Sequence, residues 1–144
     1  MGLVIRGGTV VNAGGRFTAD VKVEGRTITS IGTGLPKGAG DTEIDAAGRY
    51  VLPGLIDPHV HMELPFMGTV SADDFETGTA SGIDGGTTSI IDFCIPGAGM
   101  SLIDGLKLWR ERSAKATADY SFHMAITHWD DHTADEMRAV VRDH

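Results

Sequence analysis

Two histidines, His59 and His61, are the residues of this chain whose type and spacing best fit a chemical task. They follow shortly after an apolar segment, 50–56, that is expected to form a strand. In an extended strand, residues two apart point to the same side. Both imidazoles can therefore converge on one ion while Val60 turns into packing. Neutral imidazole is a common nitrogen ligand of zinc and similar divalent metals. We therefore predict that His59 and His61 are metal ligands.

The residues around the pair strengthen this interpretation, because a bare His-x-His also occurs by chance. A Pro-Gly pair and the apolar segment precede it, and a long loop follows. Asp57 shares the face of the histidines one step deeper, where its carboxylate can orient a ligand imidazole without touching the metal. Local hydrogen bonding beside Pro58 explains Asp57 equally well. The sequence leaves both roles open.

The chain predicts two domains. Residues 1–52 alternate short apolar and polar segments with glycine turns, including Gly7-Gly8, which predicts a small antiparallel, sandwich-like β unit. Residues 53–144 change to alternating strands and helices. Strands are expected over 50–56, 87–93 and 120–126. The first helix is expected to start within 71–74 and to end at Gly85-Gly86, and the other two are expected to start near Leu102 and Thr133.

Two features of this second part bear on the fold. The segment 87–93 is almost continuously apolar, which is typical of a strand buried on both faces of a parallel sheet. Residues 133–136 fit a capping box at the start of the third helix. Three β/α units in succession predict an α/β fold, either a parallel barrel or an open doubly wound sheet.

Composition excludes several classes of partner. The 144 residues carry a net charge of -8 and no basic run, which argues against nucleic acid. No apolar run approaches the roughly 20 residues that span a bilayer, and the N-terminus lacks a signal peptide pattern. The single cysteine, Cys94, lies in an apolar stretch and is expected to be a buried small side chain. We expect a cytoplasmic protein without membrane contact.

Several blocks of the chain, in order, resemble the D-hydantoinase/dihydropyrimidinase family of the amidohydrolase superfamily. They are the opening 5–12, the strand and loop 53–75, and the segments 85–93 and 119–127. The resemblance implies a metal-dependent (β/α)8 barrel (TIM barrel) preceded by part of a small β-sandwich. A complete barrel needs about 250 residues and eight strands. The chain is therefore expected to be a truncated N-terminal part, inactive by itself.

The resemblance also implies a centre of two divalent metals, zinc in the first instance, with His59 and His61 on one of them. A carboxylated lysine would bridge the metals, and two later histidines and an aspartate base would complete the site. Lys22, Lys37, Lys107 and Lys115 lie outside the position for the bridge. We therefore expect the bridging lysine and the base aspartate beyond His144 and assign no catalytic residue within the chain.

Further residues are predicted to contact the substrate or to support the site. The family implies that the loop after the ligands closes over the substrate, so Met62, Leu64 and Phe66 are predicted to bind it, with packing against another loop or subunit as the alternative. Asp92, at the end of the second strand, is predicted to support the site from behind. His123 has no visible partner and is expected to pack in the barrel wall.

The resemblance implies hydrolysis of the ring amide of dihydropyrimidines or 5-substituted hydantoins to N-carbamoyl amino acids, by a homotetramer or another homo-oligomer. Allantoinase and dihydroorotase are the nearest rivals. Dihydroorotases usually carry an arginine just after the His-x-His, whereas this chain has Glu63 there and no cation in reach, which favours an uncharged ring. A non-enzymatic relative that acts in assembly is the remaining alternative.

Overall fold

The computed structural model describes residues 2–143, which divide into two compact units, 2–53 and 54–143. The division that the sequence suggests falls after residue 52, one position earlier. Each unit has its own sheet and its own buried cluster. The strand expected over 50–56 is shared between them, because residues 50 and 51 pair within the first unit and a separate strand begins at Leu55.

The first unit is one mixed β-sheet. Its strands are β1 (Gly2–Asn12), β2 (Gly15–Glu24), β3 (Thr27–Gly32), β4 (Thr42–Asp45) and β5 (Tyr50–Val51). The order is β3-β2-β1-β4, with β5 also paired to β1. The pairs among β1, β2 and β3 are antiparallel, but β4 and β5 both run parallel to β1. The prediction of a purely antiparallel unit was wrong because the chain crosses back before β4 and returns to the second edge of β1.

The glycine pair Gly7-Gly8 lies inside β1 and is not the turn that the sequence suggested. The register of β1 against β2 shifts between Ile5 and Gly8, and Gly7 has a φ of 61°, so the pair forms a β-bulge. A Cβ on Gly8 would lie 2.5 Å from the Val51 side chain, so only glycine fits there. Asp20 accepts a 2.9 Å hydrogen bond from the Gly7 amide and stabilises the bulge.

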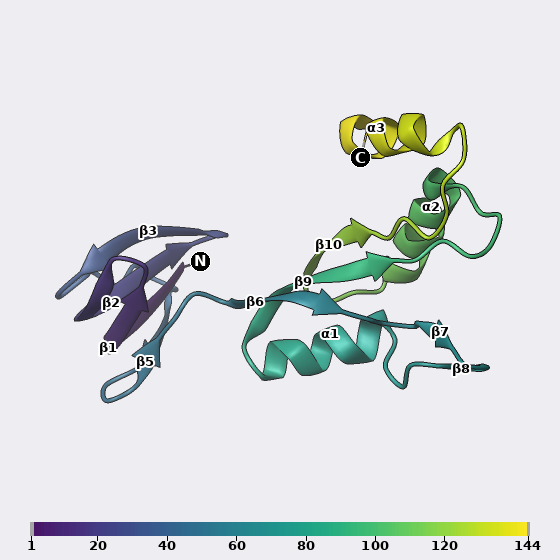
Figure 1. Cartoon of the computed structure of the whole chain (residues 1–144). Helices are drawn as coiled ribbons and strands as arrows, with labels where there is room; N and C mark the ends of the chain where they lie inside the picture. The colour runs from purple at the N-terminus through teal and green to yellow at the C-terminus, as the bar shows by residue number, and fades with distance from the viewer. Residues whose placement is uncertain (1, 144) are drawn as a thin grey trace. The chain divides into compact units, whose positions relative to one another are not determined.

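The second unit contains the predicted alternation of strands and helices (Figure 1). Its elements are β6 (Leu55–Val60), β7 (Pro65–Phe66), β8 (Thr69–Val70), α1 (Phe75–Asp84), β9 (Thr87–Cys94), α2 (Leu102–Ser113), β10 (Asp119–Met124) and α3 (Thr133–Asp143). The sheet has the order β10-β9-β6 with both pairs parallel, and Figure 1 shows its arrows pointing the same way. A short hairpin, β7–β8, follows β6.

Helix α1 begins and ends where the sequence predicted. Asp74 is its N-cap, and its side chain accepts a hydrogen bond from the Thr77 amide while Thr77 Oγ1 accepts one from the Asp74 amide. This reciprocal pair satisfies two backbone donors that the first turn leaves free. Gly85 is the C-cap, and Gly86, with a φ of 94°, takes the left-handed conformation that lets the chain turn into β9.

Helices α1 and α2 pack against one face of the three-stranded sheet, and α3 packs against α2. The buried cluster of this unit consists of Phe75, Ile90, Cys94, Leu106 and Trp109. Alternate residues of β9 are buried, so the prediction of a strand buried on both faces does not hold for the described residues. The other face lacks a helical layer there. Cys94 is fully buried as expected, and burial raises the pKa of its thiol to about 12.

Helix α3 starts differently from the prediction. Asp130 accepts hydrogen bonds from the amides of His132 and Thr133, so it takes the role expected of Thr133. Glu136 does not close a capping box. Its Oε2 instead accepts a 2.7 Å hydrogen bond from the amide of Leu102, the first residue of α2. A carboxylate at a helix N-terminus stabilises the free amides and the helix dipole, so Glu136 joins α3 to α2.

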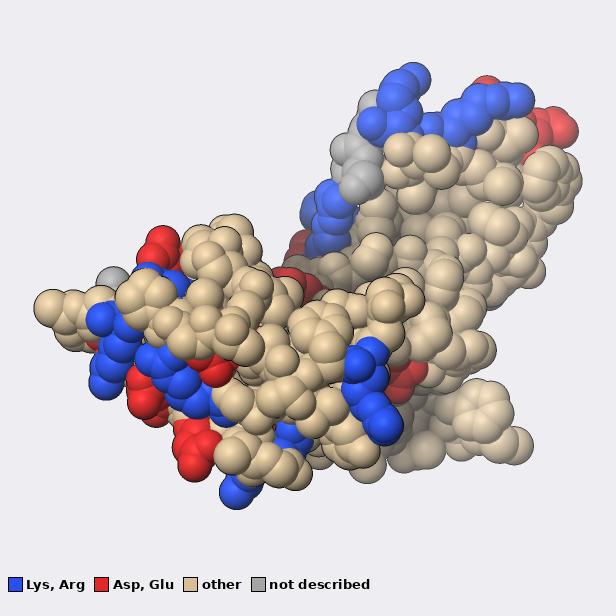
Figure 2. Space-filling model, turned by 90° about the vertical axis from the view of Figure 1, so that its left-hand side faces the viewer, with Lys and Arg blue, Asp and Glu red and all other residues tan. Residues whose placement is uncertain are grey.

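The surface carries charges of both signs. On the face shown in Figure 2, acidic and basic side chains are interspersed over the β-sheet unit and form no continuous basic surface. None of the helices α1, α2 and α3 within residues 2–143 is long and apolar enough to cross a membrane.

The contact between Glu136 and Leu102 leads to a stability prediction. We expect Glu136→Ala to lower the free energy of unfolding by about 1 kcal/mol, because the Leu102 amide loses a charged acceptor. Asp135→Ala is the matched control, since the Asp135–Arg138 pair is exposed and contributes little. Urea unfolding measures both. Equal destabilisation by the two substitutions would contradict the capping role of Glu136.

Candidate metal centre

His59 and His61 lie side by side at the end of β6. Their ring centroids are 5.1 Å apart with an angle of 84° between the planes, and both residues are exposed. Val60 and Met62, the residues that alternate with them, pack against the buried cluster under the helices. The two imidazoles therefore share the face of the sheet opposite the helices, as their spacing predicted.

The backbone just before and at His59 does not take part in regular hydrogen bonding between β6 and β9. The register of β6 against β9 is irregular between Asp57 and Val60, and Pro58 has no amide hydrogen to donate. Asp57 Oδ1 accepts a 3.1 Å hydrogen bond from the His59 amide. This contact fits the local role that the sequence left open for Asp57. The same bond ties its carboxylate to the backbone of one predicted ligand.

Asp92 lies behind the histidines, on the helix side of the sheet. It is 1% exposed and accepts hydrogen bonds from the Met62 amide at 2.7 Å and from Trp109 Nε1 at 3.0 Å. Burial raises the pKa of Asp92, opposed by these two hydrogen bonds and by the charge of His61. The carboxylate thus joins the residue after His61 to β9 and α2.

Phe93 fills the space beside the histidines on the open face. Its ring centroid lies 4.5 Å from that of His59, 5.2 Å from that of His61 and 4.8 Å from that of His123. His123, expected to pack in a wall, is exposed and places its Nε2 3.1 Å from the Pro58 carbonyl oxygen. Phe93 was not among the residues predicted for the site. Its signal was its place one residue after Asp92, which turns it to the histidine face.

Glu63, contrary to the sequence interpretation, has cations in reach. Lys115 Nζ lies 3.2 Å from Glu63 Oε1 and 2.8 Å from Asp74 Oδ2. One ammonium group therefore joins the loop that follows the two histidines, residues 62–73, called the ligand loop, to the N-cap of α1. Arg112 donates a 3.4 Å hydrogen bond to the Glu63 carbonyl. Both cations come from α2 or just after it, at least 49 residues along the chain. Only the folded chain reveals that Glu63 is neutralised from the helix side.

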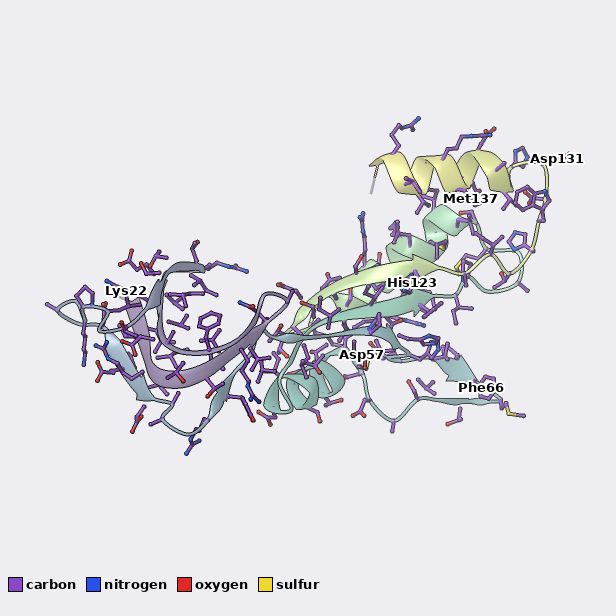
Figure 3. All side chains as sticks on the ribbon, turned by 60° about the vertical axis from the view of Figure 1, so that its left-hand side comes forward. Lys22, Asp57, Phe66, His123, Asp131 and Met137 are labelled. Carbon is purple, nitrogen blue, oxygen red and sulfur yellow. The ribbon has the colours of Figure 1, made fainter. Side chains whose placement is uncertain are left out.

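The three predicted substrate residues occupy different environments. Met62 packs against the buried cluster, and a Cβ on Gly78 of α1 would lie 2.4 Å from its sulfur, which indicates a packing role. Leu64 lines a cavity of about 280 Å³ together with residues of α2 and of the loop before it. Phe66 is 65% exposed in the β7–β8 hairpin, and Figure 3 shows it projecting beyond the sheet.

The residues present fit part of a metal centre. His59 and His61 supply two adjacent imidazoles, and no described residue hydrogen-bonds to their ring nitrogens. Within residues 2–143, no group of three or more His, Cys, Asp or Glu side chains comes together to hold an ion. A catalytic zinc normally has three protein ligands, so these two histidines provide an incomplete donor set.

Comparison with known proteins identifies the family. Rat dihydropyrimidinase is 47% identical over 147 residues, which covers 98% of this chain. The solved dihydropyrimidinase from Brevibacillus agri NCHU1002 is 44% identical and matches 99% of the chain with a TM-score of 0.93. The solved D-hydantoinase from Thermus sp. is 42% identical with a TM-score of 0.92 over 98% of the chain.

The chain belongs to the dihydropyrimidinase/D-hydantoinase family. No protein-family model matches it. The chain spans 28% of the length of the rat enzyme and 31% of each of the two solved structures. The dihydropyrimidinase-like part described here therefore contains three parallel β/α units and no closed barrel.

The contact of Lys115 with Asp74 predicts an acid-dependent loss of stability. Lys115 and the Thr77 amide lower the pKa of Asp74 from 3.8 to about 2 in the folded chain. The carboxylate therefore stabilises the fold fully above its unfolded pKa, and this contribution disappears as the pH falls from about 4 to about 2. Asp74→Asn keeps a side chain that can cap the helix but removes the titrating carboxylate. We therefore expect its melting temperature to fall less between pH 4 and pH 2 than that of the wild-type protein.

Lys115→Met is the matched partner variant for this measurement. It removes the cation and leaves the Asp74 cap in place, so it should flatten the same part of the profile by a smaller amount. Melting curves recorded at half-unit steps of pH would separate the two. Unchanged acid profiles in both variants would refute the coupling of the ligand loop to α1.

Proposed function

We propose that the protein carrying this chain is a metal-dependent cyclic amidohydrolase that opens the ring of dihydropyrimidines and 5-substituted hydantoins to N-carbamoyl amino acids. The observation that carries the proposal is the exposed pair His59 and His61, joined on one face of a parallel sheet. The names of the matched relatives, which are dihydropyrimidinases and D-hydantoinases, support this reaction over that of an allantoinase or dihydroorotase.

We propose His59 and His61 as ligands of a divalent metal, with zinc as the expected ion and a second metal completing a binuclear centre. Bound divalent metals polarise a carbonyl oxygen and lower the pKa of water, which an unreactive ring amide requires. The chain's own residues orient the ligands. Asp57 accepts the His59 amide, and Asp92 accepts the Met62 amide just beyond His61. Such supporting carboxylates fix ligand orientation.

The loop after the ligands is proposed to cover the substrate. Phe66 is the best candidate for contact with a ring substituent, because it is exposed at a projecting hairpin. Leu64 lines an apolar cavity together with residues of α2 and of the loop before α2. An apolar loop of this kind suits an uncharged ring. Met62 is better explained as the packing residue that anchors the loop to α1.

The remaining parts of the proposal concern the whole protein. We propose that the three β/α units begin a (β/α)8 barrel, whose active sites lie at the C-terminal ends of the strands. His59 and His61 lie at such an end of β6. A bridging lysine and a base aspartate would come from other strands, so residues 1–144 alone should not turn over substrate. A homo-oligomer remains the proposed assembly.

The deciding experiment compares four substrates in the complete protein. We expect turnover of dihydrouracil and of a 5-substituted hydantoin at rates well above those of dihydroorotate and allantoin. The physical reason is charge, because the Glu63 carboxylate repels a substrate carboxylate and the nearby cation Lys115 is already paired with Glu63 and Asp74. Preference for dihydroorotate would refute the substrate class, and absence of turnover and of bound metal would favour a non-enzymatic relative.

Removal of either histidine tests the metal site directly. We expect His59→Ala and His61→Ala each to lose bound metal and to lower kcat by at least about a hundredfold, since binuclear chemistry depends on both ligands. His132→Ala, at an exposed position before α3, is the control and should keep full metal content. Elemental analysis beside activity measures the effect. A variant of His59 or His61 with normal metal and rate would overturn the ligand assignment.

A further inference from the structure

Phe93 is the centre of a cluster of three imidazoles that come from two different segments. His59 and His61 come from the end of β6, His123 from β10, and Phe93 from the strand between them. All three imidazole centroids lie within 5.2 Å of the Phe93 ring centroid. Two of these imidazoles are the proposed metal ligands. The third, His123, has no role in the proposed reaction.

His123 also contacts the backbone of the ligand segment. Its Nε2 lies 3.1 Å from the Pro58 carbonyl oxygen, which precedes His59 directly in the chain. A carbonyl oxygen only accepts, so Nε2 carries the hydrogen and donates it. Strands β6 and β10 are not neighbours, because β9 lies between them. The bond therefore reaches across β9 and links residues 65 positions apart.

The position of this bond coincides with a gap in the sheet. Pairing between β6 and β9 is regular at Asp57 and resumes at Val60, with a register shift between them. Pro58 cannot donate a ladder hydrogen bond. The segment that carries His59 therefore depends on side chains, with Asp57 on its amide and His123 on the preceding carbonyl. Figure 3 shows Asp57 and His123 on this same part of the sheet.

We propose that His123 is a positioning residue for the His59–His61 pair. Its hydrogen bond sets the course of the backbone at Pro58, and its ring holds Phe93 against both ligand imidazoles. The inference rests on the proposed function, in which these imidazoles bind metal. His123 acts on the ligands through Pro58 and Phe93.

Two substitutions separate the hydrogen bond from the ring contact. His123→Phe keeps an aromatic ring beside Phe93 and removes the donor. His123→Gln places an amide nitrogen near the position of Nε2 and keeps a donor for Pro58. His132→Phe is the matched control, because His132 is exposed and distant in sequence from the ligand segment. All three are made in the complete protein.

Two measurements report on positioning. In metal-free protein, hydrogen exchange at the Val60 and Met62 amides should accelerate about tenfold in His123→Phe, because the segment opens locally. Zinc affinity, measured by competition with a chromophoric chelator, should fall about 10- to 100-fold in the same variant. His123→Gln should remain near wild type in both. The visible absorption of the cobalt-substituted protein should shift in His123→Phe alone.

The outcomes distinguish this inference from the proposed function. If the wild-type protein binds no zinc but hydrogen exchange is accelerated in His123→Phe, the metal site is refuted, while the stabilisation of the His59 segment by His123 is supported. Normal zinc binding with unchanged exchange and affinity in His123→Phe would overturn the positioning role and leave the metal site intact. A lower melting temperature alone, or equal effects of His123→Phe and His123→Gln on exchange and zinc affinity, would also overturn it.

Discussion

The buried carboxylate of Asp92 is the interaction on which the rest of the second unit depends. A carboxylate that is 1% exposed must be fully hydrogen-bonded, and it accepts from the Met62 amide and from Trp109 Nε1. These two donors belong to the ligand loop and to α2, while Asp92 itself belongs to β9. One charge therefore fixes three elements that are far apart in the chain. Loss of either donor would leave a costly charge in the core.

The two faces of the three-stranded sheet carry different kinds of residues, buried packing residues on one face and the exposed imidazoles on the other. The helices cover the face that carries Ile90, Asp92 and Cys94, and packing there holds the unit together. The other face carries Phe93 and the three imidazoles, with no regular ladder at Pro58. A strand alternates its side chains, so one segment serves both tasks. The ligand loop is held by Lys115, which contacts Glu63 in the loop and Asp74, the N-cap of α1.

Local chemistry explains why much of the fold was predictable. The bounds of α1 follow from Asp74 and Gly85, and the shared face of His59 and His61 follows from their spacing on a strand. The sequence-based predictions were wrong where one local pattern is compatible with two different structures. Gly7-Gly8 reads as a turn but forms a bulge, because Asp20 captures the Gly7 amide. Glu136 reads as a capping-box residue but caps α2, because that helix lies beside α3.

The sequence by itself determined the family, the order of strands and helices, and the face that His59 and His61 share, because these depend on periodicity and on residues close in the chain. Only the tertiary structure decided what surrounds the pair. Phe93 and Asp92 reach the segment of the two histidines from β9, His123 reaches it from β10, and Lys115 reaches Glu63 from beyond α2. These contacts join residues 30 to 65 positions apart. Their partners are set by strand register and helix packing, which no local pattern encodes.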